Sequence, residues 1–425
     1  MRKRILFKGP LLTRSGYGEQ SRFALRALRS REDLFDIYIQ PLKWGQTSWM
    51  FEVTPERAWI DQTIEKTIAY IQQGGQFDMS LQVTIPNEWQ KLAPVNIGYT
   101  AGIETNKVAP IWLQKGNEMV DKIITISKHS RDTYKNTHAL AQNTNTGQQF
   151  DYTLETPIEY VNYPAKTYES LPSLDIELET SFNFLSVAQF GPRKNLPNTL
   201  KWFVEEFNNE DVGLLLKTNI VKNSVIDRET IYKDLQKFLA SFPDRKCKVY
   251  LLHGDMTDEE MHALYKHPQI DAFLALPHGE GFGLPIWEAA YSGLPVVATG
   301  WSGQLDFLTD EQGTEHFYNV AFDMQPVQDS VVWENVIIKE SMWAYPREQS
   351  AKEKMRLCYE QMTNEETRGT EMIALEQYAQ SLHERFTPEK QYEKFVSFLE
   401  EYSDAAAISD DDWLNEVSDI IKEYE

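Results

Sequence analysis

The chain has 425 residues, a length typical of two domains of about 150 to 200 residues each rather than of one core. Hydrophobic residues make up 41% of the chain and aromatic residues 12%, which is typical of a well-packed globular protein. No apolar run approaches the roughly 18 residues that a membrane helix requires, and the first residues are too basic and interrupted for a signal peptide. We therefore expect a cytoplasmic protein with no membrane span.

The net charge of −22 is unevenly distributed along the chain. Residues 1–30 carry eight Lys or Arg side chains and one Glu, whereas residues 400–425 carry ten acids and one Lys. The acidic balance disfavours a broad nucleic-acid-binding surface, although the basic first segment could form a local positive cleft for phosphate or simply be solvated. Cys247 and Cys358 are far apart in sequence, so a disulfide framework is not expected.

Strand and helix patterns alternate through residues 1–162, which predicts a first α/β domain of the doubly wound type. Short apolar runs predict parallel strands at residues 4–7, 35–39, 79–83, 95–99 and 122–126. Helices are predicted at residues 19–29, 59–73 and 109–119. The polar residues 142–152 are predicted to form a loop or hairpin at the edge of this domain.

Residues 163–180 contain two prolines, several acids and no periodicity, and we interpret them as a linker. The alternation then resumes in a second domain, expected at residues 181–385. Its predicted strands are residues 184–188, 212–216, 248–252, 270–276 and 293–299. Its predicted helices include residues 197–207, 228–240, 257–265 and 285–291. Residues 386–425 are expected to form C-terminal helices and an acidic tail.

The most informative motif follows the predicted strand at residues 270–276. Glu280 and Glu288 stand eight positions apart across a glycine-rich turn, with Glu288 on the first turns of the next helix. Ligands of open α/β sheets bind at the carboxyl ends of strands, and Gly281 and Gly283 let a ligand approach the backbone. Free N–H groups at the helix start favour phosphate oxygens. Acidic residues also occur at helix starts simply because the helix dipole is positive there. The Gly-Phe-Gly-Leu-Pro segment between Glu280 and Glu288 argues instead for a ligand-binding turn.

This Glu-x7-Glu pattern inside Gly-x-Gly-Phe-Gly-x-Pro resembles the signature of retaining nucleotide-sugar glycosyltransferases of the GT-B fold, family 4. The resemblance implies an α/β protein with two doubly wound, Rossmann-like domains facing a cleft and C-terminal helices that cross back to the first domain. It further implies that Glu280 holds the donor sugar and Glu288 the ribose, and that Ser302 and Gly303 lie in a second donor loop. The remaining donor-binding residues that it implies are Gly16, Gly18, Arg193, Lys194, Gly281, Phe282, Gly283 and Leu284.

A second loop, after the strand at residues 184–188, carries Arg193 and Lys194 just before a helix. A cation at this point meets the helix start at the cleft, where a departing diphosphate gains charge. By resemblance, Lys194 matches the Lys of the family, whereas Gln189 stands where the family usually has Arg. Arg193 is an alternative source of that charge, although adjacent side chains rarely point the same way.

In the first domain, Gly16 and Gly18 resemble the glycine loop through which the backbone of the family approaches the donor phosphates. Ser21 stands where a dinucleotide-binding fingerprint would have its third glycine, which argues against an oxidoreductase. Glu104 follows the strand at residues 95–99 and is a candidate for the acceptor side or a loop cap. No Asp-x-Asp follows a strand, so no metal site is predicted, and cationic side chains and helix ends are expected to take its place.

We therefore interpret the chain as a metal-independent, retaining hexosyl- or pentosyltransferase that uses a UDP- or GDP-sugar and no further cofactor. Its expected catalytic residues are Glu280, Lys194 and Glu104, and front-side attack is implied by the family. A glycan or lipid-linked sugar is the favoured acceptor. The chain is also similar to transferases of large tailed bacteriophages, which makes hydroxymethylated pyrimidines in DNA an alternative acceptor if Arg14 and Arg22 line the cleft. The sequence is also compatible with an epimerase, a phosphorylase or a non-catalytic sugar-nucleotide-binding protein.

Overall fold

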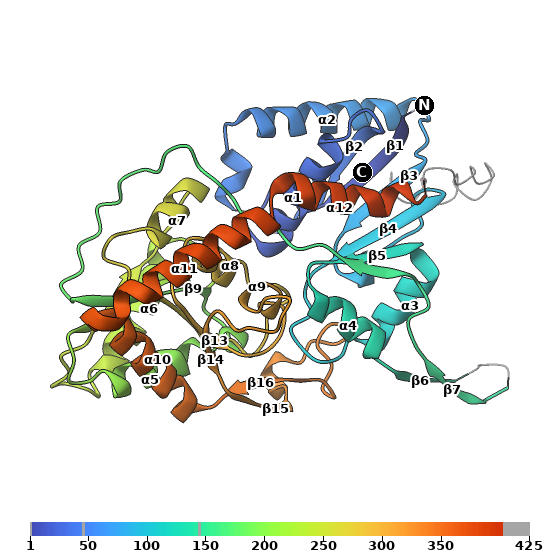
Figure 1. The fold of residues 1–425 in the computed structure, drawn as a ribbon. Helices are drawn as coiled ribbons and strands as arrows, with labels where there is room; N and C mark the ends of the chain where they lie inside the picture. Colours follow the sequence, from blue (N-terminus) through green and yellow to red (C-terminus); the bar gives the residue numbers. More distant parts are fainter. Residues whose placement is uncertain (1, 45–46, 143–145, 403–425) are drawn as a thin grey trace.

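The computed structural model describes residues 2–44, 47–142 and 146–402, which form two α/β units joined by an extended segment (Figure 1). The acidic tail predicted after residue 403 lies outside the described residues. Both units are built around a six-stranded sheet in which every pair of neighbouring strands is parallel. The predicted GT-B architecture is confirmed.

The first sheet contains the five predicted strands and one more. Its order is β2 (Phe35–Pro41), β1 (Lys3–Gly9), β3 (Met79–Val83), β4 (Val95–Thr100), β5 (Lys122–Thr125) and β8 (Ile158–Tyr160). The helices of this unit are α1 (Gly16–Arg29), α2 (Pro55–Gln72), α3 (Pro110–Met119) and α4 (Lys128–Asn136). β3 and β4 are buried along their whole length, as expected for parallel strands covered by helices on both faces. The loop or hairpin predicted at residues 142–152 is a hairpin, formed by β6 (Ala139–Gln142) and β7 (Gln149–Tyr152).

The second sheet places its first strand in the middle. Its order is β11 (Lys248–Leu252), β10 (Val212–Asn219), β9 (Phe182–Gln189), β12 (Ala272–Ala275), β13 (Val296–Thr299) and β14 (Tyr318–Val320). The helices are α5 (Leu196–Glu206), α6 (Val225–Leu239), α7 (Asp258–Tyr265), α8 (Leu284–Tyr291) and α9 (Leu305–Leu308). The strand order reverses between β9 and β12, and such a switch point opens a crevice at the carboxyl ends of the strands.

The C-terminal helices return the chain to the first domain, as predicted. α10 (Glu348–Thr363) and α11 (Glu365–Arg385) lead to α12 (Pro388–Glu400), which lies beside α1 in Figure 1. Phe23 of α1 meets Phe395 of α12 with ring centroids 5.7 Å apart. The side of α12 that carries Phe395 and Leu399 is fully buried, so the amphipathic spacing of this segment serves to cover α1.

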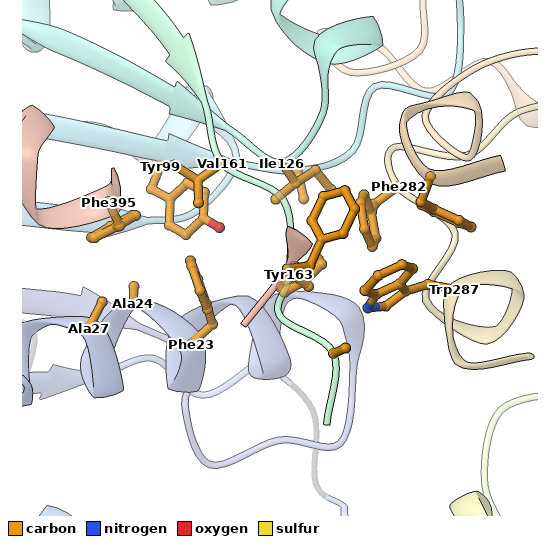
Figure 2. Packing of buried hydrophobic residues seen from close by; sticks show 14 of the residues in the cluster. Phe23, Ala24, Ala27, Tyr99, Ile126, Val161, Tyr163, Phe282, Trp287 and Phe395 are labelled. Carbon is orange, nitrogen blue, oxygen red and sulfur yellow. The ribbon is translucent and has the colours of Figure 1, made fainter. Parts of the chain in front are cut away.

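One hydrophobic cluster runs through both domains (Figure 2). Tyr163, at the start of the linker, has its ring 5.7 Å from that of Phe23 and 5.1 Å from that of Phe282. Phe282 in turn packs against Trp287 of α8. Edge-to-face aromatic contacts of this kind add to the free energy gained by burying the rings. The linker is therefore part of the core that joins the domains.

A second hairpin, which the sequence did not predict, extends from the second domain toward the first. It consists of β15 (Phe322–Pro326) and β16 (Met342–Pro346), with residues 327–341 between them. The Met342 N–H donates to Asn106 of the first domain, and the Asn106 N–H donates to the Met342 carbonyl. Within the described residues, no helix has the length and apolar character to cross a membrane.

We expect Phe395→Ala to lower the free energy of unfolding by about 3 to 5 kcal/mol, because it removes a fully buried ring that packs against Phe23. Chemical denaturation followed by circular dichroism measures this loss. Phe150→Ala is the matched control, since Phe150 is 45% exposed on the β6–β7 hairpin. Equal losses in the two variants would show that α12 does not stabilise the first domain.

Candidate active site

The two loops that follow β9 and β12 meet at the switch point of the second sheet. Lys194 Nζ lies 2.5 Å from Glu280 Oε1, and Arg193 Nη1 lies 2.9 Å from Glu280 Oε2. Arg193 also donates to the Gly279 carbonyl. The Glu280 side chain is only 8% exposed. The three residues predicted from separate motifs thus form one buried charge cluster.

The loop after β9 explains how two adjacent cations reach the same carboxylate. Residues Pro192–Lys194 form a short 3-10 turn, and Asn195 ends it in the left-handed region at φ 54°. This tight turn lies beside the Glu280 loop, since the His278 N–H donates to the Arg193 carbonyl. Each cation binds a different oxygen of Glu280. The two adjacent side chains therefore reach the same carboxylate, contrary to the expectation that adjacent side chains point in different directions.

The charges of this cluster depend on one another. Burial raises the pKa of Glu280, but Arg193 and Lys194 outweigh it, so the pKa lies below its usual value. Burial lowers the pKa of Lys194, and the neighbouring Arg193 lowers it further against the attraction of Glu280. Arg193 and Lys194 therefore neutralise Glu280 when no anionic ligand is present. A diphosphate that binds here must share these two cations with the carboxylate.

The predicted second donor loop packs against the backbone of the Glu280 turn. The Glu280 N–H donates to Ser302 Oγ at 2.9 Å, and the Ser302 hydroxyl donates to Gln304. A Cβ added to Gly303 would lie 2.0 Å from the Gly281 carbonyl oxygen, so only glycine fits this position. Ser302 and Gly303 hold the backbone of the Glu280 turn in place.

The other residues of the glycine-rich turn have different surroundings. Gly283 caps α8 with a φ of 93°, in the left-handed region that favours glycine, and Leu284 begins the helix. The Phe282 side chain is 2% exposed and packs in the interdomain core. The Phe282 side chain therefore belongs to the core, and a role for this residue in donor binding stays a prediction.

The Glu280 turn also contacts the first domain closely. The Ser127 hydroxyl donates to the Gly281 carbonyl at 2.5 Å, and a Cβ on Gly281 would lie 3.2 Å from the Ile126 side chain. Arg193 Nε lies 3.5 Å from Glu104 Oε1 of the first domain. The close approach that Gly281 permits is thus with the opposite domain, and Glu104 joins the charge cluster from that side.

The predicted glycine loop of the first domain begins α1. A Cβ on Gly18 would lie 2.0 Å from the Thr13 carbonyl oxygen, whereas a Cβ on Gly16 would meet nothing within 4 Å. Between them, the Tyr17 hydroxyl accepts from the Ala101 N–H at 3.1 Å. Gly18 is thus required by the turn itself, and Gly16 leaves open space beside the backbone.

A cleft of about 340 Å³ lies between the domains on the other side of α8. It is lined by Leu284 and Glu288 of α8, by Glu19 of α1, by Asp258 of α7 and by Lys166 of the linker. Burial raises the pKa of Glu288 to about 7, although nearby Lys166 opposes that rise. Glu288 thus lines this cleft, whereas Glu280 is not among the residues that line it.

Lys166 and Glu19 are site residues that the sequence did not reveal. Lys166 lies in a segment without periodicity, and Glu19 looks like an ordinary acid in the first turn of a helix. Burial lowers the pKa of Lys166, but the carboxylates of Glu19 and Asp258 outweigh it and raise the pKa above its usual value. Only the joining of the two domains brings these charges together.

The two arginines that a DNA acceptor would require are engaged in contacts within the protein, Arg22 buried and Arg14 23% exposed. Arg22 is 5% exposed and donates to the carbonyls of Leu11 and Thr13. Arg14 donates to the Met256 carbonyl across the domain boundary and pairs with Glu52. Their placement therefore does not provide an open positive surface. Among the described residues, no group of three or more His, Cys, Asp or Glu side chains could hold a metal ion.

The pKa of Glu288 predicts a pH dependence of stability. The folded protein binds this proton more tightly than the unfolded chain, whose glutamate has a pKa of about 4.5. The resulting stabilisation is complete below pH 4.5 and is lost as the pH rises to about 7. The glutamine of Glu288→Gln stays neutral at every pH. The free energy of unfolding of this variant, measured relative to wild type, should therefore rise by on the order of 2 kcal/mol between pH 4.5 and pH 8.

Urea denaturation of both proteins across this pH range measures the difference. Glu259→Gln is the matched control, because Glu259 lines the same cleft and is exposed. A difference between Glu288→Gln and wild type that does not change with pH would contradict a buried, protonated Glu288.

The second domain is similar in sequence to a known protein family. The model of the family Glycosyl transferases group 1 matches residues 176–320, which span β9 to β14 and both loops of the Glu280 cluster. By sequence alone, no curated protein matches the chain at a significant level.

Solved structures resemble the chain along most of its length. HepE from Anabaena, in complex with UDP and glucose, is 12% identical, with a TM-score of 0.58 over 94% of this chain and 100% of that one. Sucrose-phosphate synthase from Thermosynechococcus elongatus is 12% identical, with a TM-score of 0.60 over 95% and 100%. A glycosyltransferase from Rickettsia africae is 12% identical, with a TM-score of 0.57 over 95% and 100%. At this identity the likeness establishes the fold, so the chain has the GT-B fold and its second domain is similar to the glycosyl transferases of group 1.

Proposed function

We propose that this protein transfers a sugar from a nucleoside diphosphate sugar to a hydroxyl group of a glycan or a lipid-linked sugar, with retention of configuration. The observation that carries the proposal is the meeting of Glu280, Arg193 and Lys194 at the switch point, beside a cleft that Glu288 lines. The family match over residues 176–320 and the UDP and glucose bound to HepE support a nucleotide-sugar donor.

Each part of the donor has a partner of suitable chemistry in this proposal. The Glu288 carboxyl group binds the ribose hydroxyls, and the N–H groups at the start of α8 bind phosphate oxygens. Arg193 and Lys194 supply positive charge to the diphosphate. Glu280 accepts hydrogen bonds from sugar hydroxyls, since its carboxylate has more lone pairs than the two cations occupy. UDP- and GDP-sugars are the expected donors.

In the proposed reaction, the acceptor oxygen attacks the anomeric carbon on the face from which the diphosphate departs. The bond between the anomeric carbon and the phosphate oxygen breaks, and the acceptor proton passes to that oxygen. Negative charge grows on the diphosphate as the bond breaks, so Lys194 and Arg193 stabilise the transition state more than the bound donor. Glu104, 3.5 Å from Arg193, orients that cation from the acceptor side.

A thermal-shift screen with UDP-, GDP- and ADP-sugars tests the donor. Incubation of the stabilising sugar with oligosaccharide and lipid-linked acceptors, followed by mass spectrometry, tests the transfer. We expect stabilisation by one donor class and an acceptor whose mass increases by one sugar. Donor turnover without an acceptor would indicate an epimerase or phosphorylase, and binding without turnover would indicate a non-catalytic binding protein. Transfer to hydroxymethylated DNA alone would overturn the proposed acceptor.

We expect Lys194→Ala to lower kcat about 100-fold while the dissociation constant of the donor changes by less than about 10-fold, because its charge matters most as the diphosphate departs. Glu280 keeps Arg193 as a partner in this variant, so the protein should still fold. Steady-state kinetics and donor calorimetry measure the two effects.

Lys201→Ala is the matched control for this substitution. Lys201 lies on α5, close in sequence to Lys194, and its side chain is 48% exposed. Weaker donor binding with an unchanged kcat in Lys194→Ala would show that Lys194 binds the donor uniformly and does not act on the transition state.

A further inference from the structure

Lys166 occupies an unusual position for a linker residue. Its Nζ atom lies 2.8 Å from Glu19 Oε1 of the first domain and 3.0 Å from Asp258 Oδ2 of the second. The side chain is 26% exposed and lines the cleft that Leu284 and Glu288 also line. An ammonium group held between two domains therefore faces the space beside the start of α8.

The surrounding acids have further cationic partners besides Lys166. Glu19 also pairs with Arg22 at 3.1 Å and has Arg26 at 3.7 Å. Asp258, with a side chain that is 48% exposed, also has Arg14 at 3.8 Å and is open to water. Both carboxylates therefore keep a cationic neighbour when Lys166 also contacts a ligand.

Lys166 is the cation best placed to meet an anion in the cleft. Among the described residues that line the cleft, Arg26 is the one other basic residue, and it gives two hydrogen bonds to Glu56, at 2.7 and 2.8 Å. Lys166 has three N–H donors, of which Glu19 and Asp258 accept two. Its third donor is the one that the geometry leaves for an anion in the cleft.

We propose that Lys166 binds the diphosphate of the nucleotide donor and thereby positions it between Glu288 and the start of α8. This inference rests on the proposed function, because it assumes that a nucleoside diphosphate occupies the cleft. Glu19 and Asp258 hold the ammonium group in place before the donor arrives, so little side-chain entropy is lost on binding. Since these partners come from different domains, the complete phosphate site exists only when the domains are closed.

The test compares a nucleoside diphosphate with its nucleoside. Calorimetry with UDP and uridine, and with GDP and guanosine, gives dissociation constants for wild type and for Lys166→Met, which keeps the unbranched apolar stem and lacks the ammonium group. We expect about 10-fold to 100-fold weaker binding of the diphosphate and less than about 3-fold change for the nucleoside, because only a charge-assisted hydrogen bond to phosphate is lost. Lys166→Arg should retain most of the preference for the diphosphate.

Glu19→Gln separates a phosphate ligand from a structural bridge. In this variant a neutral amide that can still accept the Lys166 hydrogen bond replaces one competing carboxylate, so diphosphate binding should be equal to or tighter than in wild type. If Lys166 only bridges the domains, Glu19→Gln and Lys166→Met should weaken diphosphate and nucleoside alike. Unchanged diphosphate affinity in Lys166→Met would also overturn the proposal.

Two outcomes distinguish this inference from the proposed function. If wild type binds no nucleoside diphosphate, the proposed function fails, and the assignment of Lys166 fails with it. If wild type binds UDP or GDP but the variants show no selective loss, only the assignment of Lys166 fails. Should Lys166→Met not fold, Lys166→Gln provides the same comparison with a polar side chain of similar length.

Discussion

The structure depends on the aromatic core that passes through Tyr163 and joins the two domains. The Tyr163 ring lies between Phe23 of the first domain and Phe282 of the second, so separating the domains would expose aromatic surface on both of them. Figure 2 shows these rings within one packed cluster. A Cβ at Gly281 would make a tight contact with the opposite domain, 3.2 Å from the Ile126 side chain.

The closed arrangement also determines the electrostatics of the site. An acidic protein that binds a diphosphate needs cations at defined points, and each cation here is paired with a carboxylate before a ligand arrives. Arg193 and Lys194 share Glu280, while Lys166 lies between Glu19 and Asp258. Such pairing avoids unpaired buried charge, and in the proposed function it would make donor binding an exchange of partners rather than a simple attraction.

The fold alone does not identify the chemistry, because GT-B proteins of similar architecture can differ in donor and acceptor. Two further sets of contacts join the domains of this chain. On one side, Met342 and the hairpin after β14 reach Asn106 of the first domain. On the other side, Lys166 and Glu19 close the gap between the linker and α1. These contacts belong to the way this chain closes its two domains, and they define the space in which donor and acceptor would meet.

Local patterns in the sequence specify the two alternating α/β domains and the loops that carry Glu280, Lys194 and Glu288, because apolar runs, glycine turns and helix starts are signals of neighbouring residues. Packing between the domains decides which of these residues meet and what surrounds them. Phe282 lies in a binding motif, yet its side chain belongs to the core. Lys166 shows no local pattern, yet it lies in the cleft, because its partners are 147 residues back and 92 residues on in the chain. Contacts between residues so far apart depend on domain packing, which no local pattern encodes.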